Sequence, residues 1–200
     1  MFANKFKIIL ITVCYLGSLP CNSAPIQKHG ALTKKFQVEI IAFKINNSLS
    51  HTETFPLYPA LPEYNESIEL SDFDEQIESY MLLPREYLKL NKEENLIDKK
   101  SNYQVLFHYG WLQNENSSKK IHLSNSNQQQ SQYKLSGTIQ VKKGYYFTVD
   151  LNLDLQPPKI ASTPNTPKHF ILNTKRKLKR NELHYIDHPK FGLLIQITPQ

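Results

Sequence analysis

A stretch of regular alternation between apolar and polar residues, at positions 134–155, constrains the fold most strongly. Two runs, 134–142 and 145–155, flank Lys143 and Gly144, a pair that suits a tight turn. Successive side chains of a β-strand point to opposite faces, so this pattern predicts a hairpin with one buried and one solvated face. The buried face is predicted to carry Leu135, Ile139, Val141, Tyr145, Phe147, Val149, Leu151, Leu153 and Leu155, and the solvated face Tyr146, Thr148, Asp150, Asn152 and Asp154.

Four more segments are rich in β-branched and aromatic residues, which favours strands. They lie at residues 36–45, 103–111, 170–180 and 191–198. Residues 85–100 instead place leucine, isoleucine and tyrosine among charged residues, which predicts one helix.

The segments between these elements are predicted to be irregular. They comprise an acidic stretch at 46–84 interrupted by prolines, a polar loop at 114–132 and a proline-rich loop at 156–168. The whole pattern predicts an α+β fold, as a single domain with a mainly antiparallel β-sheet and few helices.

The first 23 residues have the layout of a secretory signal peptide. Two lysines precede an apolar run at residues 8–16, which is shorter than the about 20 residues that a permanent membrane-spanning helix needs. Both cysteines, Cys14 and Cys21, lie inside this segment. Residues 24–200, which we expect to form a single β-rich domain, would then contain neither a disulfide nor a cysteine metal ligand. This combination favours export to the bacterial periplasm.

Charge is unevenly distributed along the exported part of the chain. Residues 24–100 contain 9 basic and 13 acidic residues, whereas residues 101–200 contain 13 basic and 5 acidic residues. This asymmetry predicts a basic face in the C-terminal half. Export disfavours nucleic acid as its partner, so an anionic polymer of the cell envelope or an acidic protein surface is expected instead.

Motifs for catalysis are weak. Asp150 and Asp154 are the only acids on the predicted solvated hairpin face, and four residues of strand separate them by about 13 Å. Paired glycosidase carboxyl groups lie about 5 Å or about 6.5–9.5 Å apart, so these two do not form such a pair. The sequence also lacks a G-x-S-x-G nucleophile motif and a phosphate-binding glycine loop. We therefore expect a protein that is not an enzyme and that needs no cofactor.

His184, Asp187 and His188 have the spacing of metal ligands on one helical turn. Pro189 follows directly and disfavours helix at His188, and a third strong ligand would have to come from elsewhere. The sequence favours a compact turn whose side chains hydrogen-bond to the backbone, and it predicts no metal.

The densest run of positive charge is KRKLKR at residues 175–180. Cations along a strand can bind carboxylates or phosphates, which arginine contacts through two hydrogen bonds at once. The alternative is a charged edge strand, because lysine on an edge hinders pairing with other chains. The sequence leaves both interpretations open. Trp111 and Tyr146 have rings suited to stacking on sugars, although Trp111 is expected in the core.

Residues 175–199, KRKLKRNELHYIDHPKFGLLIQITP, resemble the end of the CsiV family of periplasmic peptidoglycan-binding proteins. Three more stretches are similar to the family's strands: FQVEIIAFK, YQVLFHYGWLQ and LSGTIQVKKGYYFTVDLNL. The long polar loop at 114–132 and Phe147 depart from the family's pattern.

The resemblance implies a periplasmic protein of a Gram-negative bacterium that binds peptidoglycan without catalysis. It further implies support of cell-wall synthesis by a class A penicillin-binding protein together with that synthase's outer-membrane lipoprotein activator. The alternative is a protein–protein adaptor with a basic docking face and little affinity for glycan.

The C-terminal motif suggests both structural and ligand-binding roles. Glu182, His184, Asp187, His188, Pro189 and Gly192 are expected to build a turn that joins two strands. In that turn Gly192 is expected to supply a backbone conformation that other residues resist, and Asp187 to accept backbone N–H groups. Either Arg176 or Arg180 is expected to pair with Glu182 or Asp187. We expect peptidoglycan to contact Arg176, Lys177, Lys179, Arg180 and Tyr185.

Overall fold

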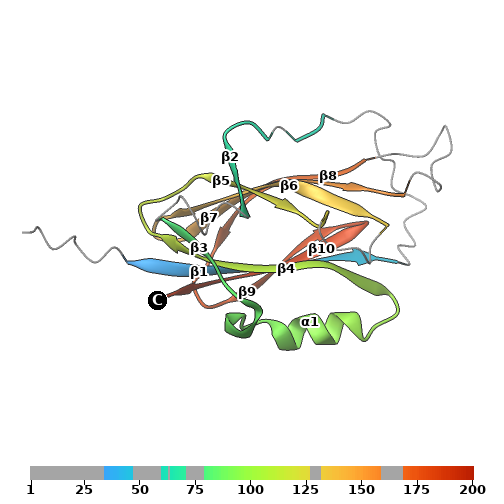
Figure 1. Ribbon diagram of the computed structural model, residues 1–200, viewed down its shortest axis with the longest axis horizontal. Coiled ribbons are helices and arrows are strands. Elements are labelled where there is room, and N and C mark those ends of the chain that lie inside the picture. Colours follow the sequence, from blue (N-terminus) through green and yellow to red (C-terminus); the bar gives the residue numbers. More distant parts are fainter. Residues whose placement is uncertain (1–33, 47–59, 63, 71–78, 127–131, 159–168) are drawn as a thin grey trace, which may run out of the picture. The chain divides into compact units, whose positions relative to one another are not determined.

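The computed structural model describes residues 34–46, 60–62, 64–70, 79–126, 132–158 and 169–200. Residues 32–200 form one compact unit, whose described part contains ten strands and one α-helix (Figure 1). The strands are β1 (Lys35–Ile45), β2 (Ser67–Glu69), β3 (Tyr80–Leu82), β4 (Tyr103–Asn114), β5 (Lys120–Ser124), β6 (Lys134–Lys143), β7 (Phe147–Gln156), β8 (Phe170–Leu178), β9 (Leu183–His188) and β10 (Phe191–Pro199). The helix α1 (Asn91–Asp98) follows a short 3₁₀ helix, η2 (Arg85–Tyr87).

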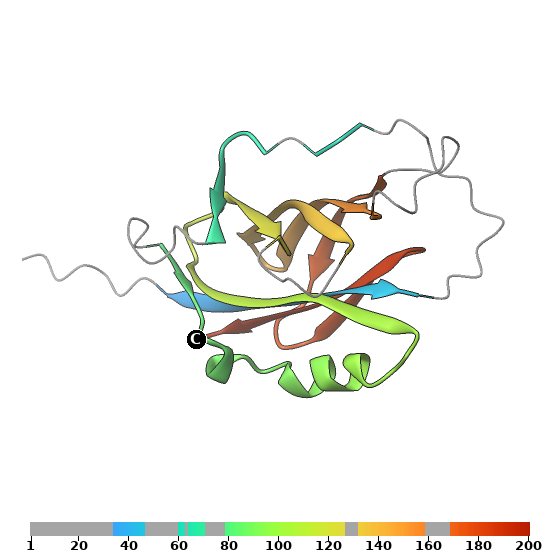
Figure 2. The ribbon, with the colours of Figure 1, turned by 45° about the vertical axis from the view of Figure 1, so that its right-hand side comes forward.

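The strands form two five-stranded sheets that pack face to face (Figure 2). Sheet A has the order β3-β4-β1-β10-β9, and sheet B has the order β2-β5-β6-β7-β8. Every neighbouring pair is antiparallel except the parallel pair β2–β5. The prediction of a mainly antiparallel β fold with few helices is confirmed.

The core lies between the sheets and follows from alternation along each strand. Every second residue of β7 from Phe147 to Leu155 is buried there, as is Trp111 on β4. Burying such side chains stabilises the fold by about 1.5–3 kcal/mol each. Inward-facing residues of β1 and β10 supply the opposite wall: Phe36, Val38, Ile40, Ala42, Phe191, Leu193, Ile195 and Ile197.

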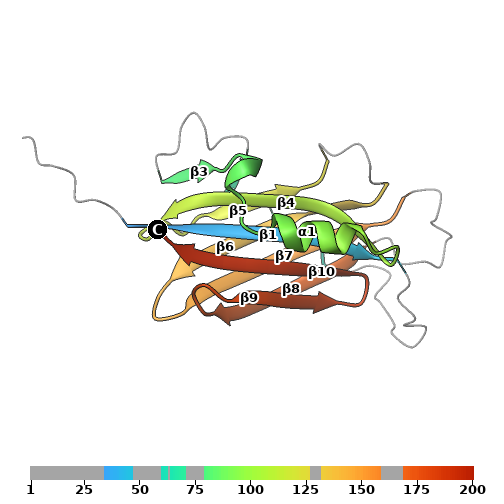
Figure 3. The same cartoon turned by 90° about the horizontal axis from the view of Figure 1, so that it is seen from below.

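The outer face of sheet A is covered by η2 and α1, which lie along β4 and β1 (Figure 3). A small apolar cluster of Ile41, Phe43 and Leu90 is buried between this face and the segment that carries the helix. Among the described residues, no helix is long and apolar enough to cross a membrane.

Several boundaries differ from the prediction. The predicted polar loop contains β5, which buries Ile121 and Leu123 completely. The predicted irregular acidic stretch contains the short strands β2 and β3. The predicted helix is shorter than 85–100 because η2 and an extended residue, Leu88, precede α1. The signal-peptide prediction and the proline-rich loop beyond residue 158 lie outside the described residues.

The predicted hairpin is confirmed, with two corrections to its faces. Tyr145 is 87% exposed instead of buried, because the turn extends over residues 144–146 and the Gly144 N–H donates to the Tyr146 carbonyl. Asp154 is 1% exposed instead of solvated, because it accepts hydrogen bonds from Gln156 and from His169, each at 2.8 Å.

Candidate functional site

The register between β7 and β8 brings the basic run next to the hairpin turn. Phe147 pairs with Leu178, so the residues just before Phe147 lie beside those just after Leu178. There they line a surface hollow of about 480 Å³, which we call the hairpin-tip hollow. Its residues are Tyr145, Tyr146, Lys179, Arg180 and Glu182.

Two aromatic rings form one side of this hollow. The rings of Tyr145 and Tyr146 meet edge to face, with centroids 4.9 Å apart and an interplanar angle of 85°. Their exposed fractions are 87% and 41%, so both present ring surface to solvent. Tyrosine combines an apolar ring with a polar hydroxyl, which suits it to contacts with sugars and other amphipathic ligands.

The two cations of the hollow, Lys179 and Arg180, differ in whether they form an ion pair. Lys179 Nζ lies 3.4 Å from a carboxylate oxygen of Glu182, and this exposed pair contributes at most about 1 kcal/mol to stability. Arg180 has no carboxylate partner within the described part of the chain. Its guanidinium is therefore free to bind an external carboxylate through two parallel hydrogen bonds. The predicted arginine pairs with Glu182 or Asp187 are absent from these residues.

Backbone geometry at Asn181 turns the chain from one sheet toward the other beside the hollow. Asn181 has a φ of 61°, a left-handed conformation that asparagine tolerates better than most residues. Its N–H donates to the carbonyl of Ile197 at 2.8 Å. The chain thus passes from the edge of sheet B to the edge of sheet A immediately after Arg180, leaving Lys179 and Arg180 at the rim of the sandwich.

The other basic residues of the run lie within β8, which is the edge strand of sheet B. Lys175 and Lys177 project from the outer face of this sheet, whereas Arg176 lies on the inner side and is exposed at the open edge. The run is therefore divided between the edge strand β8 and the hairpin-tip hollow.

Tyr185 does not lie in the hollow. It belongs to β9, in sheet A, where its ring stacks on Phe43 at 6.2 Å between centroids. Its hydroxyl donates to Asp187 Oδ1 at 2.6 Å. Burial raises the pKa of Tyr185, and the hydrogen bond to Asp187 adds to this effect.

The C-terminal motif forms a strand and a tight hairpin rather than one long turn. Leu183–His188 is strand β9, and Pro189 and Lys190 make the turn into β10. His184 and His188 face inward while Asp187 faces outward, so the three do not converge on a metal. Asp187 accepts the Tyr185 hydroxyl instead of the predicted backbone N–H groups.

The two histidines of the motif do bond to the backbone, as predicted. His184 Nε2 accepts the Lys179 N–H at 3.2 Å, and His188 Nδ1 accepts the Lys190 N–H at 3.1 Å. Burial lowers the pKa of His188 from 6.5 to about 4; Asp187 opposes this shift and Lys190 adds to it.

The reason for glycine at position 192 is steric rather than conformational. Among the described residues no glycine has a positive φ, so the predicted special backbone conformation is wrong. A Cβ at Gly192 would lie 2.6 Å from Phe43 Cζ and 2.8 Å from Tyr185 Cε2. The two rings cover this position and exclude any side chain.

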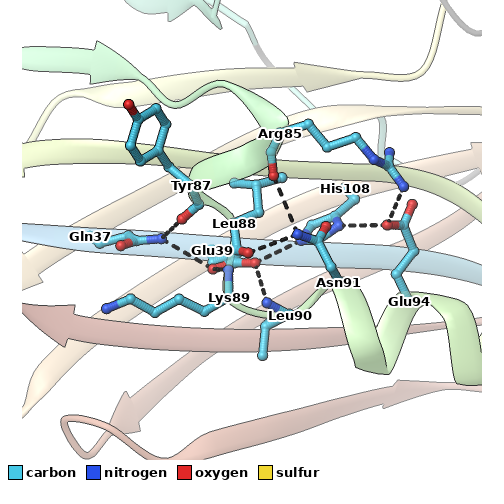
Figure 4. Close-up of polar contacts among 10 residues, drawn as sticks. All are labelled: Gln37, Glu39, Arg85, Tyr87, Leu88, Lys89, Leu90, Asn91, Glu94 and His108. Atoms are coloured by element: carbon cyan, nitrogen blue, oxygen red, sulfur yellow. Dashed lines mark hydrogen bonds and ion pairs between the residues drawn. The ribbon is translucent and has the colours of Figure 1, made fainter.

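A second polar cluster is buried between sheet A and the helical segment (Figure 4). His108 Nε2 lies 2.8 Å from Glu39 Oε1, and His108 Nδ1 lies 2.9 Å from Glu94 Oε2. Because both ring nitrogens face carboxylate oxygens, both must donate, and the imidazole carries a positive charge. Arg85 also bonds to Glu94, at 2.7 Å. We call Glu39, Arg85, Glu94 and His108 the clasp.

The clasp fixes η2 and α1 to sheet A. Glu39 accepts the backbone N–H groups of Lys89 and Leu90 at 2.9 and 2.7 Å. Burial alone would lower the pKa of His108, but its hydrogen bonds to Glu39 and Glu94 outweigh burial and raise it. Burial would likewise raise the pKa of Glu39, and the bonds from His108, Leu90 and Lys89 outweigh that effect and lower it.

The His108 side chain is 1% exposed and both of its nitrogens are engaged. The clasp is therefore a structural ion network, and His108 cannot approach a substrate. The sequence pattern did not reveal it, because its four residues come from three separate segments. A charged residue among apolar neighbours, as in VEII around Glu39, is the signal that was available.

The described residues form a β-sandwich that carries an open surface hollow at one hairpin tip. The sequence matches the family model described as "Peptidoglycan-binding protein, CsiV" over residues 5–200. The chain therefore belongs to the CsiV family of peptidoglycan-binding proteins, which confirms the resemblance. No curated protein and no solved structure shows a significant match.

Proposed function

We propose that this protein binds peptidoglycan in the periplasm through the hairpin-tip hollow, without catalysing a reaction. The observation that carries the proposal is the convergence of exposed tyrosine rings and a free guanidinium, from Tyr145, Tyr146 and Arg180, in one hollow. The family description supports peptidoglycan as the ligand.

The chemistry of peptidoglycan matches the two kinds of group in the hollow. Its sugar rings have apolar faces that can pack on Tyr145 and Tyr146, and its stem peptides carry carboxylates that Arg180 can bind. Lys179 supplies a second positive charge, and Lys177 and Arg176 extend the positive field along β8. Each contact is exposed and weak, so affinity for the polymer would come from many copies of the ligand lying close together.

The finer role follows the family resemblance. We propose that the bound protein supports cell-wall synthesis by a class A penicillin-binding protein together with its outer-membrane lipoprotein activator. The outward-facing Lys175 and Lys177 of edge strand β8 favour a second function, docking to an acidic protein surface. In that adaptor role the protein would bind the synthase and have little affinity for glycan.

Co-sedimentation with purified sacculi tests the proposed function. We expect the exported protein to pellet with sacculi and to release no soluble muropeptides. The double variant Lys179→Gln/Arg180→Gln should bind about tenfold more weakly, because one charged hydrogen-bonding site contributes about 1.5–3 kcal/mol. Tyr145→Ala tests the aromatic side in the same assay.

The charge-matched control is Lys92→Gln/Lys99→Gln, which removes two exposed lysines on the α1 side. It should bind as the wild type does. Equal weakening by both double variants would mean that only net charge matters and would contradict the hollow. Loss of binding to sacculi with retained capture of the synthase would establish the adaptor role, and released muropeptides would show a hydrolase.

A further inference from the structure

The outer face of sheet B carries rows of polar side chains. In one row His122, Thr138, Asn152 and Asn173 are successive cross-strand partners on β5, β6, β7 and β8. In the next row Lys120, Gln140, Asp150 and Lys175 are partners in the same way. Directly paired side chains have Cβ atoms about 4.5–5.5 Å apart, so each row forms a continuous polar strip across four strands.

The middle of these rows is hollowed into a cleft. The cleft has a volume of about 310 Å³ and is lined by Leu61, Lys120, Thr138, Gln140, Asp150, Asn152 and Asn173; we call it the sheet B cleft. Thr138 forms its floor and is only 5% exposed. Ligand pockets span about 300–1,000 Å³, so this volume suits one small chemical unit.

The lining of the cleft selects for a neutral polar ligand. Lys120 and Asp150 are the charged residues of the lining, and their opposite charges cancel. Lys175, whose Nζ lies 3.8 Å from Asp150, is outside the lining. The remaining polar groups are amides and a hydroxyl, which both donate and accept hydrogen bonds. The side chain of Leu61, 53% exposed, adds an apolar surface at the rim.

We propose that the sheet B cleft binds a neutral acetamido sugar of a glycan chain. Hydroxyl and acetamido groups match the amide and hydroxyl side chains of Thr138, Asn152 and Asn173, and the methyl group of the acetamide matches Leu61. This proposal rests on the proposed function: the cleft binds an acetamido sugar, while the hairpin-tip hollow contacts a neighbouring sugar face through Tyr145 and Tyr146 and a stem-peptide carboxylate through Arg180.

Strand β7 connects the two places. Asn152 follows Phe147 by five residues along β7, which is about 16 Å at about 3.3 Å per residue. The cleft lies on the outer face of sheet B and the hollow lies at the adjoining ends of β7 and β8, so one extended polymer chain can contact both at once. Recognition would then require a chain of sugars rather than a single ring.

The test uses the tetramer of N-acetylglucosamine, which carries acetamido sugars but no carboxylate and no peptide. Binding to the exported protein is measured by calorimetry or by NMR titration. The variant Asn152→Leu/Asn173→Leu keeps side chains of similar size and removes both amides. We expect it to bind the tetramer about tenfold more weakly than the wild type.

A second variant, Asn173→Trp, fills the cleft from the edge strand and should also weaken binding; thermal unfolding shows whether each variant is folded. The control variant Asn95→Leu, on α1, should bind the tetramer as the wild type does. If the folded cleft variants bind the tetramer unchanged, or if the wild type does not bind it, the cleft proposal is overturned.

Sedimentation with sacculi separates this outcome from failure of the proposed function. Wild-type protein that pellets with sacculi but does not bind the tetramer overturns the cleft alone. Wild-type protein that does not pellet with sacculi overturns both, because the cleft is proposed as part of wall binding.

Discussion

The outer faces of the two sheets differ although the sheets share one core. On sheet A, the residues Ile41, Phe43 and Leu90 bury an apolar cluster, and the clasp fixes η2 and α1 over the sheet. On sheet B, the equivalent positions carry residues such as Thr138 and Asn152, and they line an open cleft. An antiparallel sheet can be stable with one face in water, and the outer face of sheet B is covered only in part, by residues such as Leu61 and Tyr64.

The polar groups on the two outer faces differ in burial and in hydrogen bonding. The covered face contains groups with shifted pKa values, but these groups bond to one another and are buried. The open face and the adjoining hairpin tip contain groups that retain free hydrogen-bonding capacity, such as Arg180 and Asn173. Strong electrostatic coupling is therefore found among structural groups here, whereas the exposed and weakly engaged groups are those that we propose for recognition.

The largest effect is expected from breaking the clasp. Glu39→Gln removes one charge from a buried ion network and leaves the His108 imidazolium with Glu94 as its one remaining carboxylate partner in the clasp, which should cost about 3–5 kcal/mol of unfolding free energy. Asp150→Asn on the open face should change it by no more than about 0.5 kcal/mol. Urea unfolding measures both, and equal effects would remove the distinction between the faces.

Gly192→Ala is expected to have the next largest effect. The added Cβ would displace the rings of Phe43 and Tyr185 on sheet A, and overpacking of this kind costs about 1–3 kcal/mol. Gly144→Ala is the control, because its nearest contact would be the Tyr146 carbonyl oxygen at 3.3 Å. Thermal unfolding should show a clear loss for the first variant and a smaller change for the second.

The clasp also predicts a pH dependence of stability. The pKa of His108 is raised above 6.5, so its contribution is complete below pH 6.5 and is lost as the pH rises through the folded-state pKa. The pKa of Glu39 is lowered below 4.5, so its contribution is complete above pH 4.5 and is lost as the pH falls through the folded-state pKa.

The difference in unfolding free energy between the wild type and His108→Gln isolates this network. This difference is measured by denaturant unfolding across pH 3 to 9. We expect the difference to be largest between pH 4.5 and pH 6.5 and to decline on both sides of that range. A difference that does not vary with pH would show that His108 contributes by packing rather than by charge.

Among these variants of sheet A, the smallest change is expected for Tyr185→Phe. This variant removes one exposed hydrogen bond to Asp187, which contributes about 0.5–1.5 kcal/mol, and it keeps the ring on Phe43. Because Tyr185 lies on sheet A, binding to sacculi should be unchanged. Weaker binding by a variant of normal stability would extend the recognition surface to the covered sheet.

The sequence predicted the elements whose pattern is regular and local. Alternation over 134–155 was sufficient to predict β6 and β7, because successive side chains of a strand point to opposite faces and every second residue is therefore apolar. It was not sufficient for β5, since only Ile121 and Leu123 are apolar in a short polar strand. Burial of Ile121 and Leu123 depends on the opposite sheet, which a local pattern does not contain.

The candidate site was predictable only in part for the same reason. Lys179 and Arg180 stand out as basic residues, but their position beside Tyr145 follows from the pairing of Phe147 with Leu178. Similarly, the sequence singled out Gly192, but it did not show why a glycine is needed there. The reason is a tertiary contact with the rings of Phe43 and Tyr185, which belong to other strands. Contacts between distant segments determine which notable residues act together.

Hydrogen exchange of the exported protein, with and without soluble peptidoglycan fragments, tests the central claim most directly. The claim is that recognition occurs on sheet B and the hairpin tip, whereas the covered face of sheet A has a structural role. We predict slower exchange at residues 144–147 and 179–182, with no change at residues 85–98. Slower exchange confined to residues 85–98 would contradict the account and assign binding to the helical cover of sheet A.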